Sequence, residues 1–500
     1  MYPPTIAMEK PEDIAFVMAS SGDTLTYGEL DRRSNQLAHL LRGRGVGPGW
    51  SLVLVLENRI EWPIVVAAGM RSGLYVTPLN WHLAASELAV LLAEAEPAAI
   101  VTSAALRATV AEALAGRDDV ILLSTDDDGD GFDDLATAIA DLPDTPIADE
   151  LLGARVLYSG GTTGRPKAFR QQLLGVHPAE APARHAGLVS KLGVDSSTVL
   201  LSPAPNYHAA PFTFQLITLA LGGTVVCMER FDAAEAMAAI RRYGVTHSQW
   251  VPTMLLRLLR LDDRADIELS PTHRVAFTAG APCPVEVKEQ INQWWGPVLH
   301  EYYGASEGYG HTYITPEESG SHPGSVGKPL DGTRVHIADE NGVPLPTGTV
   351  GRVWFERVDN SNYRNDDDKS GWRSMGDSGY LDDDGFLYLA GRDSFMIISG
   401  GVNIYPEEIE AVLVTHSDVA DAAVFGVPDP EFGEQVKAVV ELRPGRTAGA
   451  EMEQALIEHC RNLLARFKAP KSIEFTDRLP RNPTGKLNKK DLRARYLAMR

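Results

Sequence analysis

The sequence predicts an α/β fold, with a large N-terminal domain of layered α/β sheets, a small β-rich subdomain and a small C-terminal α/β domain. Up to about residue 325, short apolar runs alternate with stretches whose apolar residues recur at helical spacing. From about residue 326, short strands are separated by Gly, Pro and Asp turns, and after residue 392 the alternation returns. A chain of 500 residues also exceeds what one hydrophobic core usually supports. We therefore expect domains over 1–392 and 393–500, with the β-rich subdomain at about 326–392.

The N-terminal part opens with a helix, because the pattern after Leu25 has apolar residues at helical spacing and ends at Gly43. A strand is expected over 51–56, a helix over 62–71 and a second strand over 75–78. Further apolar strands are expected at 98–102, 199–202, 224–228 and 274–278. Strands that alternate with helices in this way favour parallel sheets.

The longest apolar stretch runs from Phe212 to Met228. It contains Gln215, Thr218 and a Gly222-Gly223 break, so we expect a buried helix, a turn and a strand there, and no membrane span. The β-rich region and the C-terminal region supply the remaining elements. These are strands at 332–337, 351–356, 385–389, 419–427 and 436–442 and helices at 406–413 and 452–464.

Composition narrows the class of partner and the compartment. The formal net charge of −21 argues against general binding to nucleic acid or anionic membrane, since both reward a basic surface. Three cysteines lie far apart without a C-x-x-C pair, so neither a disulfide framework nor a zinc site is expected. The N-terminus has no basic region followed by an apolar run. We expect a cytoplasmic protein with small-molecule partners, and leave a homodimer open.

An acidic segment at 125–134 partly matches a calcium-binding loop. The twelfth position of that loop is Thr137, where a bidentate Glu is required. We interpret the segment as a solvated surface loop and assign it no metal. The matching residues are Asp126, Asp128, Asp130, Gly131 and Asp134.

Two stretches carry residues suited to nucleotide chemistry. Residues 158–167, Tyr-Ser-Gly-Gly-Thr-Thr-Gly-Arg-Pro-Lys, form a Gly/Thr-rich loop whose N–H groups and hydroxyls could wrap a polyphosphate, with a cation at its end. Residues 480–486, Pro-Arg-Asn-Pro-Thr-Gly-Lys, place one lysine on a Gly-Lys turn. The first stretch is not a P-loop, because Lys167 follows Pro166 and no Gly-Lys-Ser/Thr occurs.

Five further stretches stand in order between these two: Pro-Asn-Tyr-His at 205–208, Thr-Ala-Gly-Ala-Pro at 278–282, Tyr-Gly-Ala-Ser-Glu at 303–307, Met-Gly-Asp at 375–377 and Gly-Arg-Asp-Ser-Phe at 391–395. With these stretches, nearly the whole chain resembles the adenylate-forming superfamily, specifically its acyl-CoA synthetases. The resemblance implies ATP, Mg²⁺ and coenzyme A as cofactors. It also implies a C-terminal domain that rotates between two half-reactions.

The resemblance assigns most site residues to ATP. Ser159, Thr162, Thr163 and Lys167 would hold the phosphates, although Gly160 and Ala168 depart from the usual pattern. Gly280 and Ala281 would lie near the adenine, on a weak motif. Tyr303 would stack on the adenine, Ser306 would assist, and Asp377 and Arg392 would bind the ribose. Glu307, with Thr162, would hold Mg²⁺, since a hard cation prefers carboxylate and hydroxyl oxygens.

The remaining assignments concern the acid, coenzyme A and catalysis. The resemblance places His208 beside the carboxylate being activated, where it would orient the substrate. Gly400 and Gly401 would border the pantetheine arm, in keeping with close approach to a glycine backbone. Ser394 stands at the hinge position, where Asp or Lys is usual, and we interpret it as a retuned hinge. Lys486 would bridge the carboxylate and the α-phosphate during adenylation, giving catalytic roles to Lys486, His208 and Glu307.

The predicted function is an acyl-CoA ligase that converts an apolar carboxylic acid (fatty, steroid side-chain or aryl) to acyl-AMP and then to acyl-CoA. No carrier domain follows residue 500 and no long insertion interrupts 330–376, which favours a free-standing ligase. Glycines at 304, 308 and 310 beside Phe214, Trp250 and Tyr309 suggest a roomy apolar cleft. Two alternatives stay open: an acyl-AMP ligase serving a carrier protein, and a non-catalytic binder of nucleotide or acyl-CoA.

Overall fold

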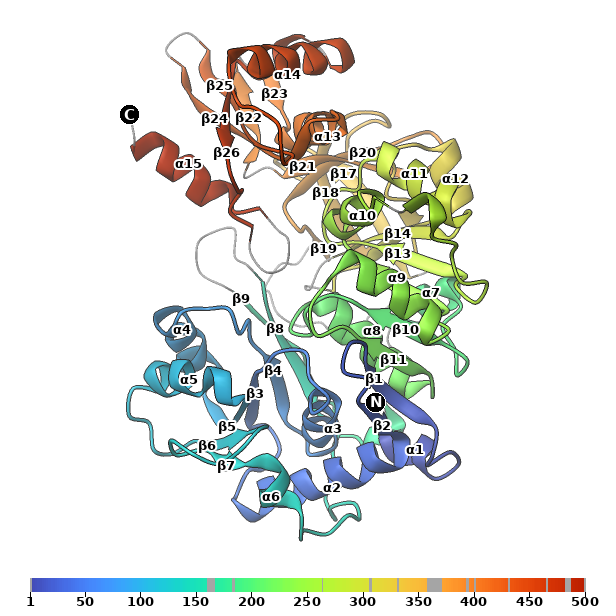
Figure 1. Cartoon of the computed structure of the whole chain (residues 1–500), viewed down its shortest axis with the longest axis vertical. Helices are drawn as coiled ribbons and strands as arrows, with labels where there is room; N and C mark the ends of the chain where they lie inside the picture. The colour runs from blue at the N-terminus through green and yellow to red at the C-terminus, as the bar shows by residue number, and fades with distance from the viewer. Residues whose placement is uncertain are drawn as a thin grey trace. The chain divides into compact units, whose positions relative to one another are not determined.

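The computed structural model describes the chain apart from residues 1, 160–166, 182–184, 263, 305–307, 331, 358–370, 393–394, 400–401, 430–431, 465, 482–486 and 499–500. The chain divides into two compact units. The first comprises Met1–Trp250, Arg260–Phe277 and Asn360–Asp367, and the second comprises Val251–Leu259, Thr278–Asp359 and Asp368–Arg500. The mixed α/β architecture predicted from the sequence is confirmed (Figure 1). The domain boundary expected near residue 393 stays a prediction.

The first sheet of the first unit has the strand order β7-β6-β5-β3-β4-β8-β9. Its strands pair in parallel, except that β8 and β9 are antiparallel. The bounds are β3 Ser51–Val55, β4 Tyr75–Pro78, β5 Pro97–Thr102, β6 Ile121–Ser124, β7 Asp133–Asp134, β8 Ala154–Ser159 and β9 Lys167–Arg170. The helices are α2 Tyr27–Gly43, α3 Trp62–Arg71, α4 Ala85–Ala95, α5 Arg107–Leu114 and α6 Leu135–Ile139.

Strand β3 is buried along its whole length because helices cover both faces of this sheet. Leu52 and Leu54 pack into a core with side chains of α2 and α3. Val53 and Val55 point the other way and pack with side chains of α4 and α5. A parallel sheet covered on both faces needs continuous apolar strands, which is why Ser-Leu-Val-Leu-Val reads as one run in the sequence.

The second sheet of the first unit has the order β13-β12-β10-β11-β1-β2. Its bounds are β1 Ile14–Met18, β2 Thr24–Thr26, β10 Val199–Ser202, β11 Thr224–Cys227, β12 His247–Trp250 and β13 Val275–Thr278. The accompanying helices are α1 Pro3–Ala7, α7 Ala186–Leu192, α8 Ala209–Ala220 and α9 Ala233–Arg242. The apolar stretch 212–228 forms α8, a turn and β11, as predicted. Among the described residues, no helix combines the length and apolarity needed to cross a membrane.

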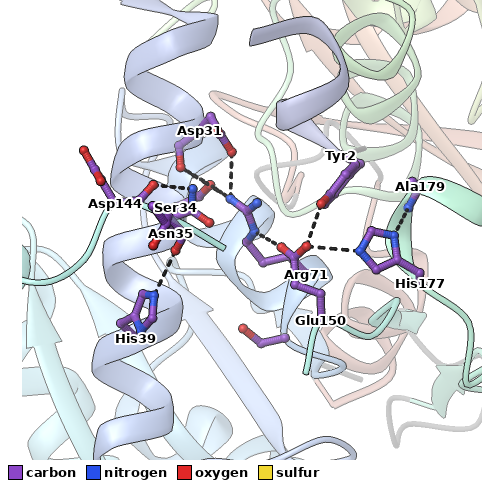
Figure 2. Close-up of polar contacts among 12 residues, drawn as sticks. Tyr2, Asp31, Ser34, Asn35, His39, Arg71, Asp144, Glu150, His177 and Ala179 are labelled. Carbon is purple, nitrogen blue, oxygen red and sulfur yellow. Dashed lines mark hydrogen bonds and ion pairs between the residues drawn. The ribbon is translucent and has the colours of Figure 1, made fainter. Parts of the chain in front are cut away.

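A buried ionic network ties the N-terminal segment to the first sheet (Figure 2). The Arg71 guanidinium, whose side chain is fully buried, lies 2.7 Å from Glu150 Oε1 and 2.9 Å from Asp31 Oδ1. The Tyr2 hydroxyl donates to Glu150 Oε2 at 2.6 Å, and His177 Nε2 lies 3.2 Å from the same oxygen. Burial raises the pKa of the Tyr2 hydroxyl to about 12, with Glu150 adding to the shift. The network therefore joins residues from five separate segments of the chain.

The second unit begins with three neighbouring strands, in the order β16-β15-β14, and with three helices. Their bounds are β14 Leu299–Gly304, β15 His311–Ile314, β16 Lys328–Pro329, α10 Pro252–Leu259, α11 Val285–Trp295 and α12 Pro316–Ser321. A five-stranded antiparallel sheet follows, with β17 Thr333–Ala338, β18 Gly351–Arg357, β19 Trp372–Arg373, β20 Asp377–Leu381 and β21 Leu387–Arg392. Its core contains Val335, Val353, Phe355 and Leu387.

The C-terminal part of this unit contains a five-stranded sheet and three helices. The strand order is β23-β22-β25-β24, with β26 paired to β25. The strands are β22 Ile397–Ser399, β23 Val402–Ile404, β24 Val419–Asp429, β25 Gly433–Leu442 and β26 Ser472–Thr476. The helices are α13 Pro406–Thr415, α14 Ala450–Leu463 and α15 Lys489–Ala498. Ile409 and Leu413 of α13 and Leu456 and Cys460 of α14 share one core with strands β24 and β25.

The acidic segment at 125–134 is organised by protein contacts. Asp126 accepts a hydrogen bond from the backbone N–H of Ala104 at 2.7 Å and pairs with the Arg59 guanidinium. Asp134 is the N-cap of α6, where its carboxylate accepts from the backbone N–H of Thr137 at 2.8 Å. Asp134, which matches the ninth position of a calcium-binding loop, therefore has a structural role, because a carboxylate at a helix N-cap accepts a hydrogen bond from an otherwise unpaired N–H group.

Candidate active site

Two of the predicted nucleotide residues in the second unit, Tyr303 and Asp377, lie in direct contact. Tyr303 is near the end of β14 and Asp377 begins β20, 74 residues later in the chain. The Tyr303 hydroxyl donates to Asp377 Oδ2 at 2.6 Å. Asp377 is buried, with 8% of its surface exposed. The structure therefore joins two side chains that the sequence assigned to the same nucleotide from separate motifs.

Arg392, the second predicted ribose contact, lies opposite Asp377. Strands β20 and β21 pair antiparallel, with Asp377 and Arg392 as cross-strand partners. Directly opposed residues in an antiparallel pair have their Cβ atoms about 4.5–5.5 Å apart. The side chain of Arg392 is outside the described part of the structure, so the backbone register carries this placement.

The Tyr303 ring packs against the core of the five-stranded sheet. Its centroid lies 5.8 Å from that of Phe355 on β18, with the two planes at 42°. Glu301, on the same strand β14, forms an ion pair of 2.9 Å with Lys288 of α11, and each of the two side chains is only 4% exposed. No sequence motif signals this pair. It holds the strand that carries Tyr303 against α11, and its value depends on burial that only the fold supplies.

Gly280 and Ala281 lie in the exposed connection between β13 and α11. Gly280 has φ +87°, a conformation that favours glycine. A Cβ built at this glycine would approach only Val251 Cγ1, at 3.9 Å, so the backbone conformation and not crowding requires glycine. Their predicted role near the adenine stays a prediction.

His208 lies in the first unit, at the N-cap position of α8. Its ring centroid is 4.2 Å from that of the buried Tyr207, and the preceding Asn206 accepts from Gln215 Nε2 at 2.7 Å. The backbone N–H of Asn206 donates to Asn58 Oδ1 at 2.8 Å. A side-chain network thus fixes the turn that presents His208, while the predicted contact with a substrate carboxylate stays a prediction.

The ends of the Gly/Thr-rich loop are brought together by β8 and β9. Ser159 and Lys167 are cross-strand partners in this antiparallel pair, so the loop between them is closed at its base. The remaining predicted site residues lie outside the described residues. They are Thr162, Thr163, Ser306, Glu307, Ser394, Gly400, Gly401 and Lys486, and the side chains of Ser159 and Lys167 are likewise not described. The described residues contain no group of three or more His, Cys, Asp or Glu side chains that could hold a metal ion.

Two aromatic residues expected along an apolar cleft are core side chains. Phe214 is 2% exposed and Trp250 is 1% exposed, and the Phe214 ring packs 4.5 Å from Phe277. Gly310 also has a packing role, because a Cβ there would fall 2.6 Å from Phe355 Cδ1. The sequence pattern could not separate a cleft lining from a core, since both are built from the same apolar residues.

Comparison with known proteins identifies the family of the chain. The family model described as AMP-binding enzyme matches residues 5–360, and the AMP-binding enzyme C-terminal domain matches residues 408–486. A long-chain-fatty-acid–CoA ligase of Mycobacterium tuberculosis is 30% identical, over 98% of this chain and 97% of that protein. A fatty acid–[acyl-carrier-protein] ligase of Streptomyces coeruleorubidus is 29% identical, over 95% of this chain and 92% of its own.

Among solved structures, the o-succinylbenzoate CoA synthetase of Bacillus subtilis in complex with its acyl-adenylate intermediate superposes with a TM-score of 0.83. The two chains are 27% identical, and the match covers 98% of this chain and 97% of that one. ATP and coenzyme A are the substrates of ligases in this family, which generally require Mg²⁺. The chain belongs to the AMP-binding enzyme family and is an AMP-forming ligase of the adenylate-forming superfamily, in the class of the acyl-CoA synthetases.

Proposed function

We propose that this enzyme activates an apolar carboxylic acid with Mg·ATP and transfers the acyl group to coenzyme A. The observation that carries the proposal is the hydrogen bond between Tyr303 and Asp377, with Arg392 opposite on the neighbouring strand. An aromatic ring tied to a buried carboxylate offers a stacking surface for a base and acceptors for two ribose hydroxyls. Membership in the family makes adenosine the nucleoside that this pair would recognise.

In the first half-reaction, a carboxylate oxygen of the acid attacks the α-phosphorus of ATP, and pyrophosphate leaves with the electrons of the broken P–O bond. Lys486 would lie between the carboxylate and the α-phosphate and offset the negative charge of the transition state. Removing one electrostatic contact of this kind commonly lowers kcat by about 100- to 1000-fold. Glu307 and Thr162 would hold the Mg²⁺, which would offset the negative charge of the phosphates, and the loop over 159–167 would hold the β- and γ-phosphates.

In the second half-reaction, the thiol sulfur of coenzyme A attacks the acyl carbon, the thiol proton is released, and AMP leaves with the electrons of the carbon–oxygen bond. This step would follow rotation of the domain over 393–500 about Ser394. Rotation would withdraw Lys486 and bring Gly400 and Gly401 to the pantetheine arm. His208 would orient the acid in both steps.

The choice of an apolar acid rests on two points. The relative from Mycobacterium tuberculosis acts on long-chain fatty acids, and the likeness to it extends over nearly the whole chain. No acidic residue that could accept the ammonium group of an amino acid stands close in sequence to His208. A fatty, steroid side-chain or aryl acid fits both points.

A second acceptor is favoured by one specific observation. The relative from Streptomyces coeruleorubidus, at similar identity, transfers its fatty acid to an acyl-carrier protein. Both acceptors present the same pantetheine thiol, so the residues of the adenylation step do not separate them. An acyl-AMP ligase serving a carrier protein is therefore the second candidate.

The test incubates a panel of acids, from acetate to long-chain, aryl and steroid acids, with Mg·ATP in the presence and absence of coenzyme A. Mass spectrometry follows AMP, acyl-AMP and acyl-CoA. The proposal predicts acyl-CoA for apolar acids, and a loss of about 100- to 1000-fold in adenylation for Lys486→Ala.

Each other outcome has a defined meaning. Acyl-AMP that accumulates with coenzyme A in excess supports the carrier-protein acceptor. No ATP consumption with any acid supports a non-catalytic binder and overturns the proposal. Thioester formation that is unchanged in Lys486→Ala would refute the assigned mechanism.

A further inference from the structure

A buried cluster of one lysine and two glutamates lies in the C-terminal part of the second unit. Lys489, the first residue of α15, places its Nζ 3.0 Å from Glu407 Oε1 and 2.9 Å from Glu410 Oε1, both on α13. The Lys489 side chain is 8% exposed. Because buried charges are costly unless each one is paired, the lysine is confined to this position.

The same cluster contacts both sides of the predicted hinge residue. A Cβ at Gly391, on β21 next to Arg392, would fall 2.6 Å from Glu407 Oε2, so the carboxylate packs directly on that backbone. On the other side of the hinge, the Phe395 ring centroid lies 5.5 Å from Lys489 Nζ. Glu410 Oε1 also accepts the backbone N–H of Val424 on β24, at 2.7 Å.

The described residues that bracket the segment 482–486 are held together. Arg481 and Leu487 form an isolated antiparallel β-bridge, and the backbone N–H of Asn488 donates to Pro480 O at 2.9 Å. The Arg481 guanidinium pairs with Asp421 of β24. Two ionic contacts therefore flank the segment, Arg481–Asp421 before it and Lys489–Glu407/Glu410 after it. Lys486 directly precedes Leu487 and stands three residues before Lys489.

We propose that Lys489, held by Glu407 and Glu410, is a positioning residue for Lys486 in the adenylation step. This inference rests on the proposed function, in which Lys486 acts on the α-phosphate. A displacement of about 1 Å in a catalytic group can cost about 100-fold in rate. Loss of the anchor should therefore lower adenylation, while thioester formation from a ready-made acyl-AMP, which does not need Lys486, should be spared.

The experiment compares Lys489→Met with Lys489→Arg, which retains the charge, and with Lys490→Met, which removes the neighbouring exposed lysine. ATP–pyrophosphate exchange measures the first half-reaction, and conversion of synthetic acyl-AMP with coenzyme A measures the second. For Lys489→Met we expect kcat for exchange to fall about 10- to 100-fold, with KM for ATP and the second half-reaction within about threefold of wild type. Lys489→Arg should recover most of the exchange rate, and Lys490→Met should match wild type.

A measurement without substrate makes failure of this inference distinguishable from failure of the proposed function. Hydrogen–deuterium exchange at the amides of Asn488 and Leu492 should rise at least about tenfold in Lys489→Met. The Asn488 amide donates to Pro480 O across the base of the segment, and the Leu492 amide donates to Asn488 O in the first turn of α15, which Lys489 begins. The double variant Lys489→Met/Glu410→Gln, which removes one of the two carboxylates that lose their cation, replaces the single variant if that does not fold.

The results that overturn the positioning role are specific. Unchanged amide exchange in a folded variant shows that Lys489 does not anchor the segment. An equal loss in both half-reactions shows a general structural defect. Equal behaviour of the variants at 489 and 490 shows that the burial of Lys489 has no consequence for catalysis. If wild type consumes no ATP with any acid, the proposed function and the positioning role are both wrong, and the amide exchange still decides whether Lys489 anchors the segment.

Discussion

Replacing Tyr303 by Phe removes one oxygen atom from the candidate site and keeps the aromatic ring. That oxygen donates to Asp377 Oδ2 at 2.6 Å, and Asp377 is 8% exposed. A hydrogen bond to a charged group contributes about 1.5–3 kcal/mol, or about 10- to 150-fold in an equilibrium constant. A water molecule can take the place of part of the lost contact, so the lower end applies. We expect KM for ATP to rise about tenfold, with kcat within about threefold, because the variant keeps the ring that would stack on the adenine and does not change the reacting atoms.

Steady-state kinetics with varied ATP and saturating acid measures this change. Tyr313→Phe is the matched control, because the Tyr313 hydroxyl also lies 2.6 Å from its partner, His300 Nδ1, on the same strand pair. The control removes an equal contact away from the predicted ribose residues, so KM for ATP should stay within twofold. An unchanged KM in Tyr303→Phe, or an equal rise in both variants, would refute the assignment of the Tyr303–Asp377 pair to the nucleotide.

Two further predictions concern buried charge. Arg71→Met should lower the free energy of unfolding by about 3 kcal/mol, because it leaves Glu150 buried without its cation. Urea denaturation measures this, and Lys10→Met, which breaks an exposed pair with Asp13, should change stability by less than about 0.5 kcal/mol. Burial raises the pKa of Glu410 to about 7 from its ordinary value of 4.5. Since the folded state then holds a proton that the unfolded state has lost, this group contributes stability below about pH 4.5 that is lost as the pH rises through about 7. The stability of Glu410→Gln relative to wild type should therefore increase between pH 5 and pH 8, and a difference that does not depend on pH would contradict the shift.

Most of the fold could be predicted from local pattern. The helix over 62–71 and the strand over 75–78 have the observed bounds, because a helix of apolar residues that ends just before a glycine turn and a short buried strand leave a clear signature in sequence. The helix that ends at Gly43 begins at Tyr27 with Thr26 as its N-cap, accepting from the Glu29 N–H, which is local chemistry of the same kind.

The candidate site could be predicted in part because its residues sit in short ordered motifs. Tyr303 and Asp377 came from different stretches, and the structure brings their side chains together. The sequence did not indicate the roles of Phe214 and Trp250, because the same aromatic residue types line clefts and fill cores. What separates them is the few per cent of surface left exposed, which depends on residues distant in sequence.

The cluster at Lys489 was invisible in sequence for a related reason. The chain has 46 basic and 67 acidic residues. A lysine in a basic C-terminal stretch and two glutamates that follow Tyr405-Pro406 therefore do not stand out in the sequence. Their role becomes visible only in the fold, where Lys489, which follows Glu407 by 82 positions in the sequence, is enclosed by Glu407 and Glu410. Burial changes the energetic effect of the ion pair. An exposed ion pair adds little to the free energy of unfolding, whereas removing one partner of a buried pair lowers it strongly. Sequence motifs therefore predict the residues that would touch substrate, whereas burial and pairing in the structure point to residues that would hold them in place.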